Sequence, residues 1–235
     1  NARRCVPRSA AVTRLRRRSL DVRQFDLVAF DLYGTLLDVS GLAARMEPLA
    51  GGDVGELLGR WRLAQLERSW AVGRGAPYEP WDAVTLRALE EVAPAIPGET
   101  RRRLADLWLD VPAFPDASAT LDGLKRAGAR RAVLSNGTAA MIRAALAASG
   151  LDVDEILSAD AVRAYKTDPR VYALLDDRAD PARVLFVSAN GWDVDGAGRA
   201  GRTVAWVDRG GEPPSAPPRF RLHGLADVLG IVGRA

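Results

Sequence analysis

One stretch near the start of the chain, residues 25–39 with the sequence FDLVAFDLYGTLLDV, constrains the fold more than any other. It joins a short apolar run, residues 27–30, to the carboxylate Asp31 and then to a turn with Gly34 and Thr35. An apolar run that ends in a turn is typical of a strand buried on both faces of a parallel sheet. Ligands of such sheets bind at the carboxyl ends of the strands. Asp31 is therefore either a reactive carboxylate or an Asp that only caps the turn.

The charge of the chain is unevenly distributed. Residues 1–24 hold eight Arg and one Asp, a net charge of +7, so the remainder of this 235-residue chain of net charge +3 carries −4. Such a basic segment with few apolar residues cannot bury enough surface to fold, and we interpret it as a disordered leader. The same composition also fits three alternatives: a transit peptide, an arm that binds an anionic surface or nucleic acid, or a misplaced upstream start.

The composition predicts a soluble globular protein. Hydrophobic residues make up 48% of the chain and charged residues 27%, and no apolar run approaches the roughly 20 residues that cross a bilayer. We expect no membrane partner, and nucleic acid is not expected as a partner of the folded body. The single cysteine, Cys5, excludes an internal disulfide and fits a reducing compartment, so we predict a cytoplasmic location.

Helical and strand-like patterns divide the chain. Residues 41–109 have helical periodicity broken by prolines and no obvious strand, which predicts about four helices. After them, strands alternate with helices, which predicts a parallel sheet. The predicted strands are 131–135, 155–158, 184–188, 203–207 and 220–222, and the predicted helices are 117–127, 139–149, 169–176, 192–200 and 225–229. We therefore expect an α/β protein: a Rossmann-like core over residues 25–40 and 110–235, with an α-helical cap over residues 41–109.

Polar side chains follow several of the predicted strands. Asp31 ends the first strand, Ser135 and Asn136 end the second, and Lys166 lies in a loop before a helix. The segment 188–193 follows a further strand and carries Ser188, Asn190 and Asp193. Because the carboxyl ends of parallel strands meet at one edge of the sheet, these groups are expected to converge.

This order of motifs resembles the haloacid dehalogenase superfamily. The general motifs match as DxxGT at Asp31, followed by Ser135, Lys166 and an acidic segment at Asp193, over residues 25–210. Finer features are similar to its type II 2-haloacid dehalogenase branch. Tyr33 stands where the superfamily phosphatases place a second Asp, and residues 188–193 (SANGWD) look like the SxNxWD of that branch. Residues 61–67 (WRLAQLE) and 165–172 (YKTDPRVY) are similar to its WRxxQLE and YKPDxRVY segments.

The resemblance implies hydrolytic dehalogenation of short (S)-2-haloacids to (R)-2-hydroxyacids and halide. Asp31 would attack C2 of the acid and form an ester, which water would then hydrolyse. Lys166 would keep Asp31 ionised where a phosphatase would use Mg²⁺. The resemblance therefore implies no metal and no cofactor, a small-molecule 2-haloacid as the partner, and a homodimer, since members of this branch are often dimers.

The resemblance also suggests a role for each site residue. Asp193, oriented by Asn190 and Lys166, would activate water, and Tyr172 and Ser188 would position Lys166 and Asp193. Ser135 would hold the substrate carboxylate, and the halide would be cradled by Arg62, Asn136 and Trp81. Thr35 belongs with the catalytic residues, and Tyr33 and Trp192 belong with those that contact the substrate. The alternative for these polar residues is to satisfy strand ends, and for Arg62 to snorkel to the surface. For the aromatic residues it is packing in the core.

Two other functions stay open on the sequence alone. The first is a Mg²⁺-dependent small-molecule phosphatase with a degenerate second Asp, although Tyr33 replaces neither a metal ligand nor a proton donor. The second is a catalytically idle fold recruited through its basic arm. His223 is the only histidine and lies far from the motifs, so no His-based triad is expected. Arg68, Trp81 and Thr167 depart from the pattern of the branch and leave substrate size and halide preference open.

Overall fold

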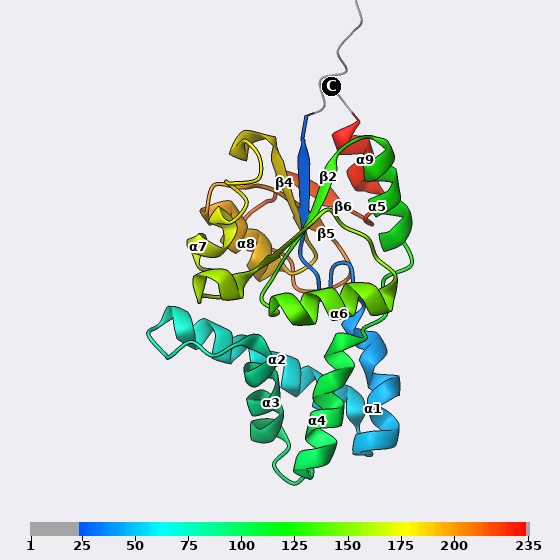
Figure 1. Ribbon diagram of the computed structural model, residues 1–235, viewed down its shortest axis with the longest axis vertical. Helices are drawn as coiled ribbons and strands as arrows, with labels where there is room; N and C mark the ends of the chain where they lie inside the picture. The colour runs from blue at the N-terminus through cyan, green and yellow to red at the C-terminus, as the bar shows by residue number, and fades with distance from the viewer. Residues whose placement is uncertain (1–23, 234–235) are drawn as a thin grey trace, which may run out of the picture.

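A parallel sheet organises the computed structural model, which describes residues 24–233. Within this range the sheet has six strands in the order β3-β2-β1-β4-β5-β6. The strands are β1 (Leu27–Phe30), β2 (Arg130–Ser135), β3 (Glu155–Ser158), β4 (Val184–Ser188), β5 (Thr203–Val207) and β6 (Phe220–Leu222). All neighbouring pairs are parallel, with Phe30 of β1 opposite Val133 and Val187. The carboxyl ends of the strands therefore lie at one edge, which faces the helices α1–α4 in Figure 1.

Helices cover the sheet on both sides. Figure 1 shows α5 (Ala117–Arg126) and α9 (Asp227–Val232) on one side and α7 (Pro169–Ala173) and α8 (Gly191–Arg199) on the other. The helix α6 (Ala139–Ser149) connects β2 to β3. Short 3-10 helices lie at Val39–Gly41, Leu107–Leu109, Ala159–Val162 and Pro181–Arg183. Helices on both sides are the usual way for a parallel sheet to bury both of its faces.

The helices next to the sheet's carboxyl edge begin at identifiable caps. Thr138 accepts a hydrogen bond from the amide of Met141 at the start of α6, and Gly150 ends that helix in the left-handed conformation with φ 67°. Asp168 accepts from the amide of Arg170 at the start of α7. These caps fix where the loops that carry Ser135, Asn136 and Lys166 turn into helices.

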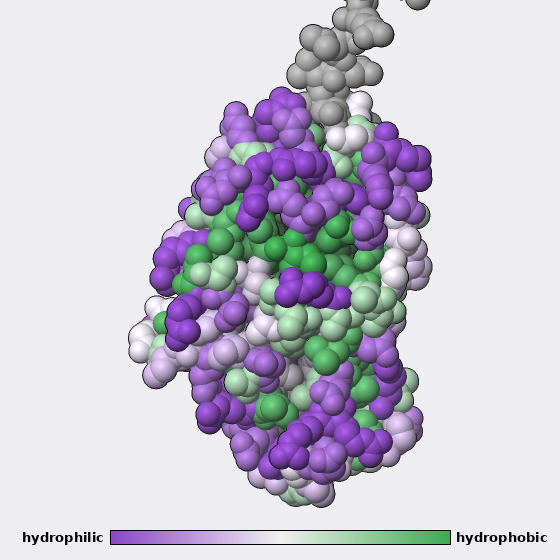
Figure 2. Space-filling model, viewed as in Figure 1, coloured by the Kyte–Doolittle hydropathy of each residue, from purple (hydrophilic) through white to green (hydrophobic). Residues whose placement is uncertain are grey.

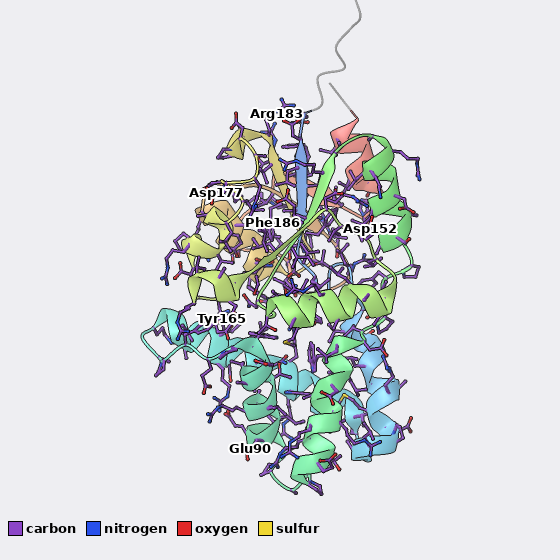
Figure 3. The ribbon with its side chains drawn as sticks, viewed as in Figure 1. Glu90, Asp152, Tyr165, Asp177, Arg183 and Phe186 are labelled. Atoms are coloured by element: carbon purple, nitrogen blue, oxygen red, sulfur yellow. The ribbon has the colours of Figure 1, made fainter. Side chains whose placement is uncertain are left out.

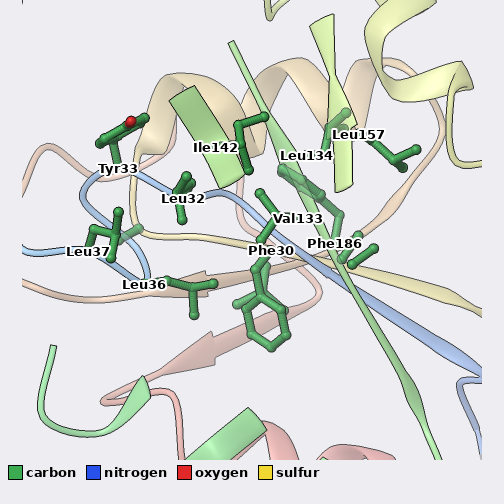
Figure 4. Close-up of a cluster of buried hydrophobic side chains, with 14 of the residues drawn as sticks. Phe30, Leu32, Tyr33, Leu36, Leu37, Val133, Leu134, Ile142, Leu157 and Phe186 are labelled. Carbon is green, nitrogen blue, oxygen red and sulfur yellow. The ribbon is translucent and has the colours of Figure 1, made fainter. Parts of the chain in front are cut away.

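The core is centred on β1 and its two neighbours. Phe30, Val133 and Phe186 are fully buried and lie together in the cluster shown in Figure 4. The Phe186 ring also packs edge to face on Tyr172 of α7, with centroids 5.7 Å apart. On the surface, hydrophobic residues gather in the middle of the face shown in Figure 2, and hydrophilic residues lie toward the two ends.

Four helices are inserted between β1 and α5: α1 (Leu42–Ala50), α2 (Val54–Gly73), α3 (Trp81–Val92) and α4 (Gly98–Asp106). They contact the sheet-containing part through aromatic residues. The Tyr33 hydroxyl donates to the carbonyl of Trp108 at 2.9 Å, and the Tyr78 hydroxyl donates to Asp160 at 2.6 Å. Tyr165 lies where the end of α2 approaches the core in Figure 3, and its hydroxyl donates to the carbonyl of Glu79.

The predicted fold class, an α/β parallel sheet, is confirmed, and most predicted elements lie within a residue or two of their observed bounds. Two helices were misplaced. The helix predicted at 169–176 ends at Ala173, because Leu175 and Asp176 donate their amides only three residues back and tighten the chain into turns. The helix predicted at 225–229 starts at Asp227, since Asp227 and Asp116 hold the preceding amides of His223 and Leu225 in a turn.

Two other expectations concern the ends of the chain and membranes. The basic leader predicted for residues 1–24 lies, apart from Gln24, outside the described residues. Across residues 24–233, none of the helices has the length and apolar character needed to span a bilayer.

Glycine contacts in α8 give a test of the packing at the sheet's carboxyl edge. A Cβ at Gly191 would lie 2.5 Å from the backbone carbonyl of Glu212, whereas a Cβ at Gly198 would meet nothing within 4 Å. We expect Gly191→Ala to lower the free energy of unfolding by roughly 1–3 kcal/mol through overpacking. Gly198→Ala is the matched control and should raise it by up to about 1 kcal/mol. Urea denaturation followed by circular dichroism measures both, and equal effects would contradict the packing described.

Candidate active site

Asp31 is the side chain on which the polar groups converge. It follows β1, is 6% exposed, and its amide donates to the carbonyl of Val187 at 2.9 Å. Its Oδ1 accepts a hydrogen bond from Lys166 Nζ at 2.8 Å. Its Oδ2 accepts from Thr35 Oγ1 at 2.9 Å and from Asn190 Nδ2 at 2.8 Å. Donors on both oxygens fix the orientation of the carboxylate.

Lys166 lies between two carboxylates. Its Nζ is 2.8 Å from Asp31 Oδ1 and 2.8 Å from Asp193 Oδ2, and its side chain is 1% exposed. The ammonium also lies 5.0 Å from the centre of the Phe186 ring. Burial acts to lower the pKa of Lys166, but the charges of Asp193 and Asp31 outweigh it, and the pKa is raised. Lys166 is therefore a fixed positive charge at neutral pH.

Asp193 is the most deeply buried carboxylate of this group. It lies in the first turn of α8, and its Oδ1 accepts from the Tyr172 hydroxyl at 2.7 Å. Burial raises the pKa of Asp193, and the positive charge of Lys166 only partly opposes that effect. Burial, together with the nearby charge of Asp193, also raises the pKa of Tyr172, which stays a neutral donor. A carboxylate with a raised pKa is a better proton acceptor than an ordinary Asp.

This donor set does not suit a divalent cation. A metal ion between the carboxylates of Asp31 and Asp193 would have to displace the Lys166 ammonium, which hydrogen-bonds to both. Tyr33 stands two residues after Asp31. Burial raises the pKa of its phenol far above the usual value, so Tyr33 is not an anionic ligand. Among residues 24–233, no group of three or more His, Cys, Asp or Glu side chains is arranged to hold a metal ion.

A small cavity lies in front of Asp31, between the sheet edge and the inserted helices. Its volume is about 10 Å³, roughly the room that one water molecule needs. It is lined by Asp31, Tyr33, Arg62, Leu66, Trp81, Ser135, Asn136, Lys166 and Trp192. Arg62 and Leu66 come from α2 and Trp81 from the start of α3, whereas the other residues follow strands or lie in α8 and the Lys166 loop. The cavity is therefore built from both parts of the chain.

Arg62 is the second cation of the cavity. Its guanidinium carbon lies 5.7 Å from the centre of the Trp108 ring. Burial lowers the pKa of Arg62, and the charge of Asp31 is the largest effect that raises it. In the part of the chain that the structure describes, no hydrogen bond or ion pair joins the Arg62 side chain to another residue. This guanidinium is thus positioned to receive an anion in the cavity.

The structure brings the predicted site residues to one edge of the sheet, but it changes two of the expected contacts. The Asn190 amide donates to Asp31 and to the carbonyl of Tyr33, so Tyr172 rather than Asn190 orients Asp193. Ser188 Oγ accepts a hydrogen bond from the backbone amide of Asn190 at 3.2 Å. Ser188 therefore positions the loop that carries Asn190 and does not contact Lys166 directly.

The second strand supplies two further predicted residues. Ser135 Oγ accepts from the amide of Gly137 at 3.2 Å, and Asn136 Oδ1 accepts from the backbone amide of Lys166 at 2.9 Å. Asn136 therefore lines the cavity and also fixes the Lys166 loop. Because both of these side chains face the cavity, they remain candidates for contacts with substrate.

Three residues near the site were missed on sequence. Leu66 lines the cavity, one helical turn after Arg62. Trp108 supplies the carbonyl that accepts from Tyr33. Arg209 follows β5, and its guanidinium donates to the carbonyl of Thr35 at 3.1 Å and to Asp116 at 2.8 Å. The spacing of Leu66 from Arg62 was a usable signal, as was the position of Arg209 after a strand.

The fold and this site match one family of hydrolases. The model of the haloacid dehalogenase-like hydrolase family matches residues 25–201. The chain belongs to the haloacid dehalogenase-like hydrolases.

Its relatives match this chain over most of their length. (S)-2-haloacid dehalogenase 1 from Pseudomonas sp. strain CBS-3 is 40% identical over 212 residues, which cover 85% of this chain and 92% of the relative. (S)-2-haloacid dehalogenase 4A from Burkholderia cepacia is 38% identical, with 87% and 94% covered. The structure of L-2-haloacid dehalogenase from Xanthobacter autotrophicus with chloropropionic acid covalently bound superposes with a TM-score of 0.82 at 31% identity, covering 88% of this chain and 98% of that one.

Lys166 gives a test of the electrostatics of the site. Lys166→Met leaves the buried carboxylates of Asp31 and Asp193 without a counter-charge, and we expect it to lower the free energy of unfolding by about 3–5 kcal/mol at pH 7. The loss should shrink at pH 5, because buried carboxylates without a counter-charge have raised folded-state pKa values and bind protons that the unfolded chain does not.

Lys125→Met is the matched control. Lys125 is the only other lysine of the chain, and its ion pair with Asp152 is largely exposed. Its replacement should change the free energy of unfolding by less than about 1 kcal/mol at either pH. Urea denaturation at pH 7 and pH 5 measures both variants. A cost for Lys166→Met that grows on acidification would contradict the charges assigned to the site.

Proposed function

We propose that the protein hydrolyses short (S)-2-haloacids to (R)-2-hydroxyacids and halide, and that Asp31 is the nucleophile. One observation carries this proposal: the Asp31 carboxylate is held by the Lys166 ammonium and faces a cavity that also contains the guanidinium of Arg62. The (S)-2-haloacid dehalogenases among the relatives support the same reaction, as does the related structure with chloropropionic acid covalently bound.

The first step needs a nucleophile and an anion cradle. A carboxylate oxygen of Asp31 attacks C2 of the haloacid from the side opposite the halogen, so that a carbon–oxygen bond forms as the carbon–halogen bond breaks. The halide leaves with the bonding electron pair, and the configuration at C2 inverts. Halide is already a stable anion and needs no proton donor. The cation of Arg62 and the amide of Asn136 line the cavity and stabilise the departing charge.

The second step needs a base and donors to an oxyanion. Water attacks the carboxyl carbon of the Asp31 ester while Asp193 accepts its proton, which suits the raised pKa of Asp193. Thr35 and Asn190 donate to Oδ2 and Lys166 to Oδ1, so charge that develops on either oxygen meets a donor. The ester then breaks between this carbon and the oxygen bound to C2. That oxygen takes the proton held by Asp193, and the Asp31 carboxyl group that is restored releases its own proton to solvent. One oxygen of Asp31 thereby passes into the product.

Substrate binding involves the rest of the cavity. Ser135 and the backbone amides after Asp31 are the proposed donors to the substrate carboxylate. Tyr33, Leu66 and Trp192 line the remaining wall. Because a 2-haloacid is several times larger than the water-sized cavity, lining side chains have to move when it binds.

Several expectations stay predictions. The boundaries of the cap at residues 41–109, a homodimer and a cytoplasmic location belong to this group. The Mg²⁺-dependent phosphatase is disfavoured because the Lys166 ammonium occupies the position between the two carboxylates. The 2-haloacid is the proposed partner, and no cofactor takes part in the proposed steps.

The nucleophile is tested by Asp31→Asn with (S)-2-chloropropionate as substrate. We expect chloride release by the wild type, unchanged by EDTA, and a loss of roughly 10³-fold or more in the variant because the amide is not a nucleophile. Chloride release and lactate configuration measure the reaction. Hydrolysis of p-nitrophenyl phosphate that requires Mg²⁺, together with no chloride release, would show a phosphatase instead.

The base is tested by Asp193→Asn under single-turnover conditions. Ester formation does not need the base, whereas ester hydrolysis does, so we expect one burst of chloride and then arrest. Intact-protein mass spectrometry should detect wild-type protein without adduct and variant protein carrying the propionate ester. Peptide mapping should place the adduct on Asp31. Arrest without an adduct would assign Asp193 a part in the first step.

A further inference from the structure

Arg209 lies outside the cavity in front of Asp31 but contacts a residue that binds the nucleophile. It follows β5, and its side chain is 17% exposed. Its guanidinium donates to the carbonyl of Thr35 at 3.1 Å and to Asp116 Oδ1 at 2.8 Å. The guanidinium carbon also lies 3.6 Å from the centre of the Phe114 ring. Arg209 is not among the residues that line the cavity, so it has no part in the steps proposed above.

The contacts of Arg209 join the two segments that connect the sheet to the inserted helices. Thr35 belongs to the outgoing segment, between β1 and α1, and Phe114 belongs to the returning segment, just before α5. The two segments also pair with each other through an antiparallel bridge between Leu37 and Ala113. Arg209 therefore binds both segments on the core side of that bridge.

Thr35 transmits this restraint to the nucleophile. Its carbonyl accepts from Arg209, while its hydroxyl donates to Asp31 Oδ2 at 2.9 Å and accepts from the amide of Ala189 at 2.9 Å. Thr35 is fully buried, and a buried carbonyl that loses its donor is costly. Because the hydrogen bond to Asp31 depends on direction, a shift of the Thr35 backbone changes that bond as well.

Arg209 is itself held from two sides. Asp116 accepts from Arg209 with Oδ1 and from the amide of Leu225 with Oδ2, at 2.9 Å, so this carboxylate is fixed between two donors. The Phe114 ring lies against the guanidinium. A planar guanidinium can stack on a ring while it donates hydrogen bonds, which the ammonium of a lysine does less well.

We propose that Arg209 is a positioning residue for dehalogenation: through the carbonyl of Thr35, it holds the Thr35 hydroxyl against Asp31 Oδ2. This inference rests on the proposed function and adds to it a residue outside the cavity. The Thr35 hydroxyl keeps the Asp31 carboxylate in the orientation for attack on C2, and it donates to Oδ2 when charge develops there. Loss of Arg209 therefore slows the chemical steps and leaves the substrate's contacts in place.

The first test separates chemistry from binding. Arg209→Gln removes the guanidinium, and the measurement is chloride release from (S)-2-chloropropionate. Thr35 and Arg209 both lie outside the cavity lining. We therefore expect kcat to fall roughly tenfold, whereas KM changes by less than about twofold.

Arg221→Gln is the matched control. Like Arg209, Arg221 pairs with a carboxylate, Asp208 at 2.6 Å, and lies over an aromatic ring, Trp206 at 5.2 Å. Its side chain is 62% exposed, and these contacts do not include Thr35. This variant should keep the kcat and KM of the wild type.

A double-mutant cycle tests whether Arg209 acts through Thr35. Thr35→Val removes the hydroxyl and keeps the backbone carbonyl, so in that background Arg209→Gln has no hydroxyl to displace. We expect the second substitution to lower kcat by less than about twofold there. Slow variants are measured with enzyme and substrate at similar concentrations, and thermal unfolding of each variant reports the folded fraction.

Arg209→Lys is the second variant if Arg209→Gln does not fold, because it keeps a positive charge beside Asp116. We expect kcat to fall for this variant too, with KM unchanged, since it loses the planar guanidinium. Equal losses of kcat in both Thr35 backgrounds, or a loss confined to KM, would make Arg209 a structural residue only and leave the proposed function intact. Wild-type protein that releases no chloride would reject the proposed function itself.

Discussion

The Lys166 ammonium, shared between Asp31 and Asp193, is the interaction on which the site depends. Two buried carboxylates would otherwise face each other without a positive charge between them. The ammonium lies 2.8 Å from an oxygen of each and supplies that charge. It does so without offering an exchangeable coordination sphere, which a metal ion would provide. One lysine thus joins the cavity-lining carboxylate that we propose as the nucleophile to the fully buried carboxylate that we propose as the base.

The surroundings of the two carboxylates differ in a way that matches two chemical roles. Asp31 accepts hydrogen bonds on both oxygens and lines the cavity, where an electrophilic carbon can approach it. Asp193 lies behind Lys166, is fully buried, and has a pKa that burial raises. These different environments within one small site suit the two roles that we propose, a nucleophile for Asp31 and a base for Asp193.

The inserted helices supply the part of the cavity lining that the edge of the sheet does not provide. They contribute Arg62, Leu66 and Trp81 to the lining of the cavity in front of Asp31, and Arg62 brings a cation to it. Their contacts with the core run through aromatic residues, including Tyr33 with Trp108 and Tyr165 with Trp81. Tyr165 immediately precedes Lys166, so the residue that packs on the insert and the residue that carries the ammonium are neighbours in one loop.

The sequence by itself determined the fold class, the order of the elements and the set of polar residues at the strand ends. It could do so because buried parallel strands leave a local apolar pattern, and their carboxyl ends must share one edge. It did not determine that the Asn190 side chain donates to Asp31 rather than to Asp193, that Arg209 reaches the Thr35 carbonyl, or that the Arg62 guanidinium lies against the Trp108 ring. Those features were decided by the tertiary structure, because hydrogen bonds and burial between residues far apart in the chain depend on side-chain directions that no local pattern encodes.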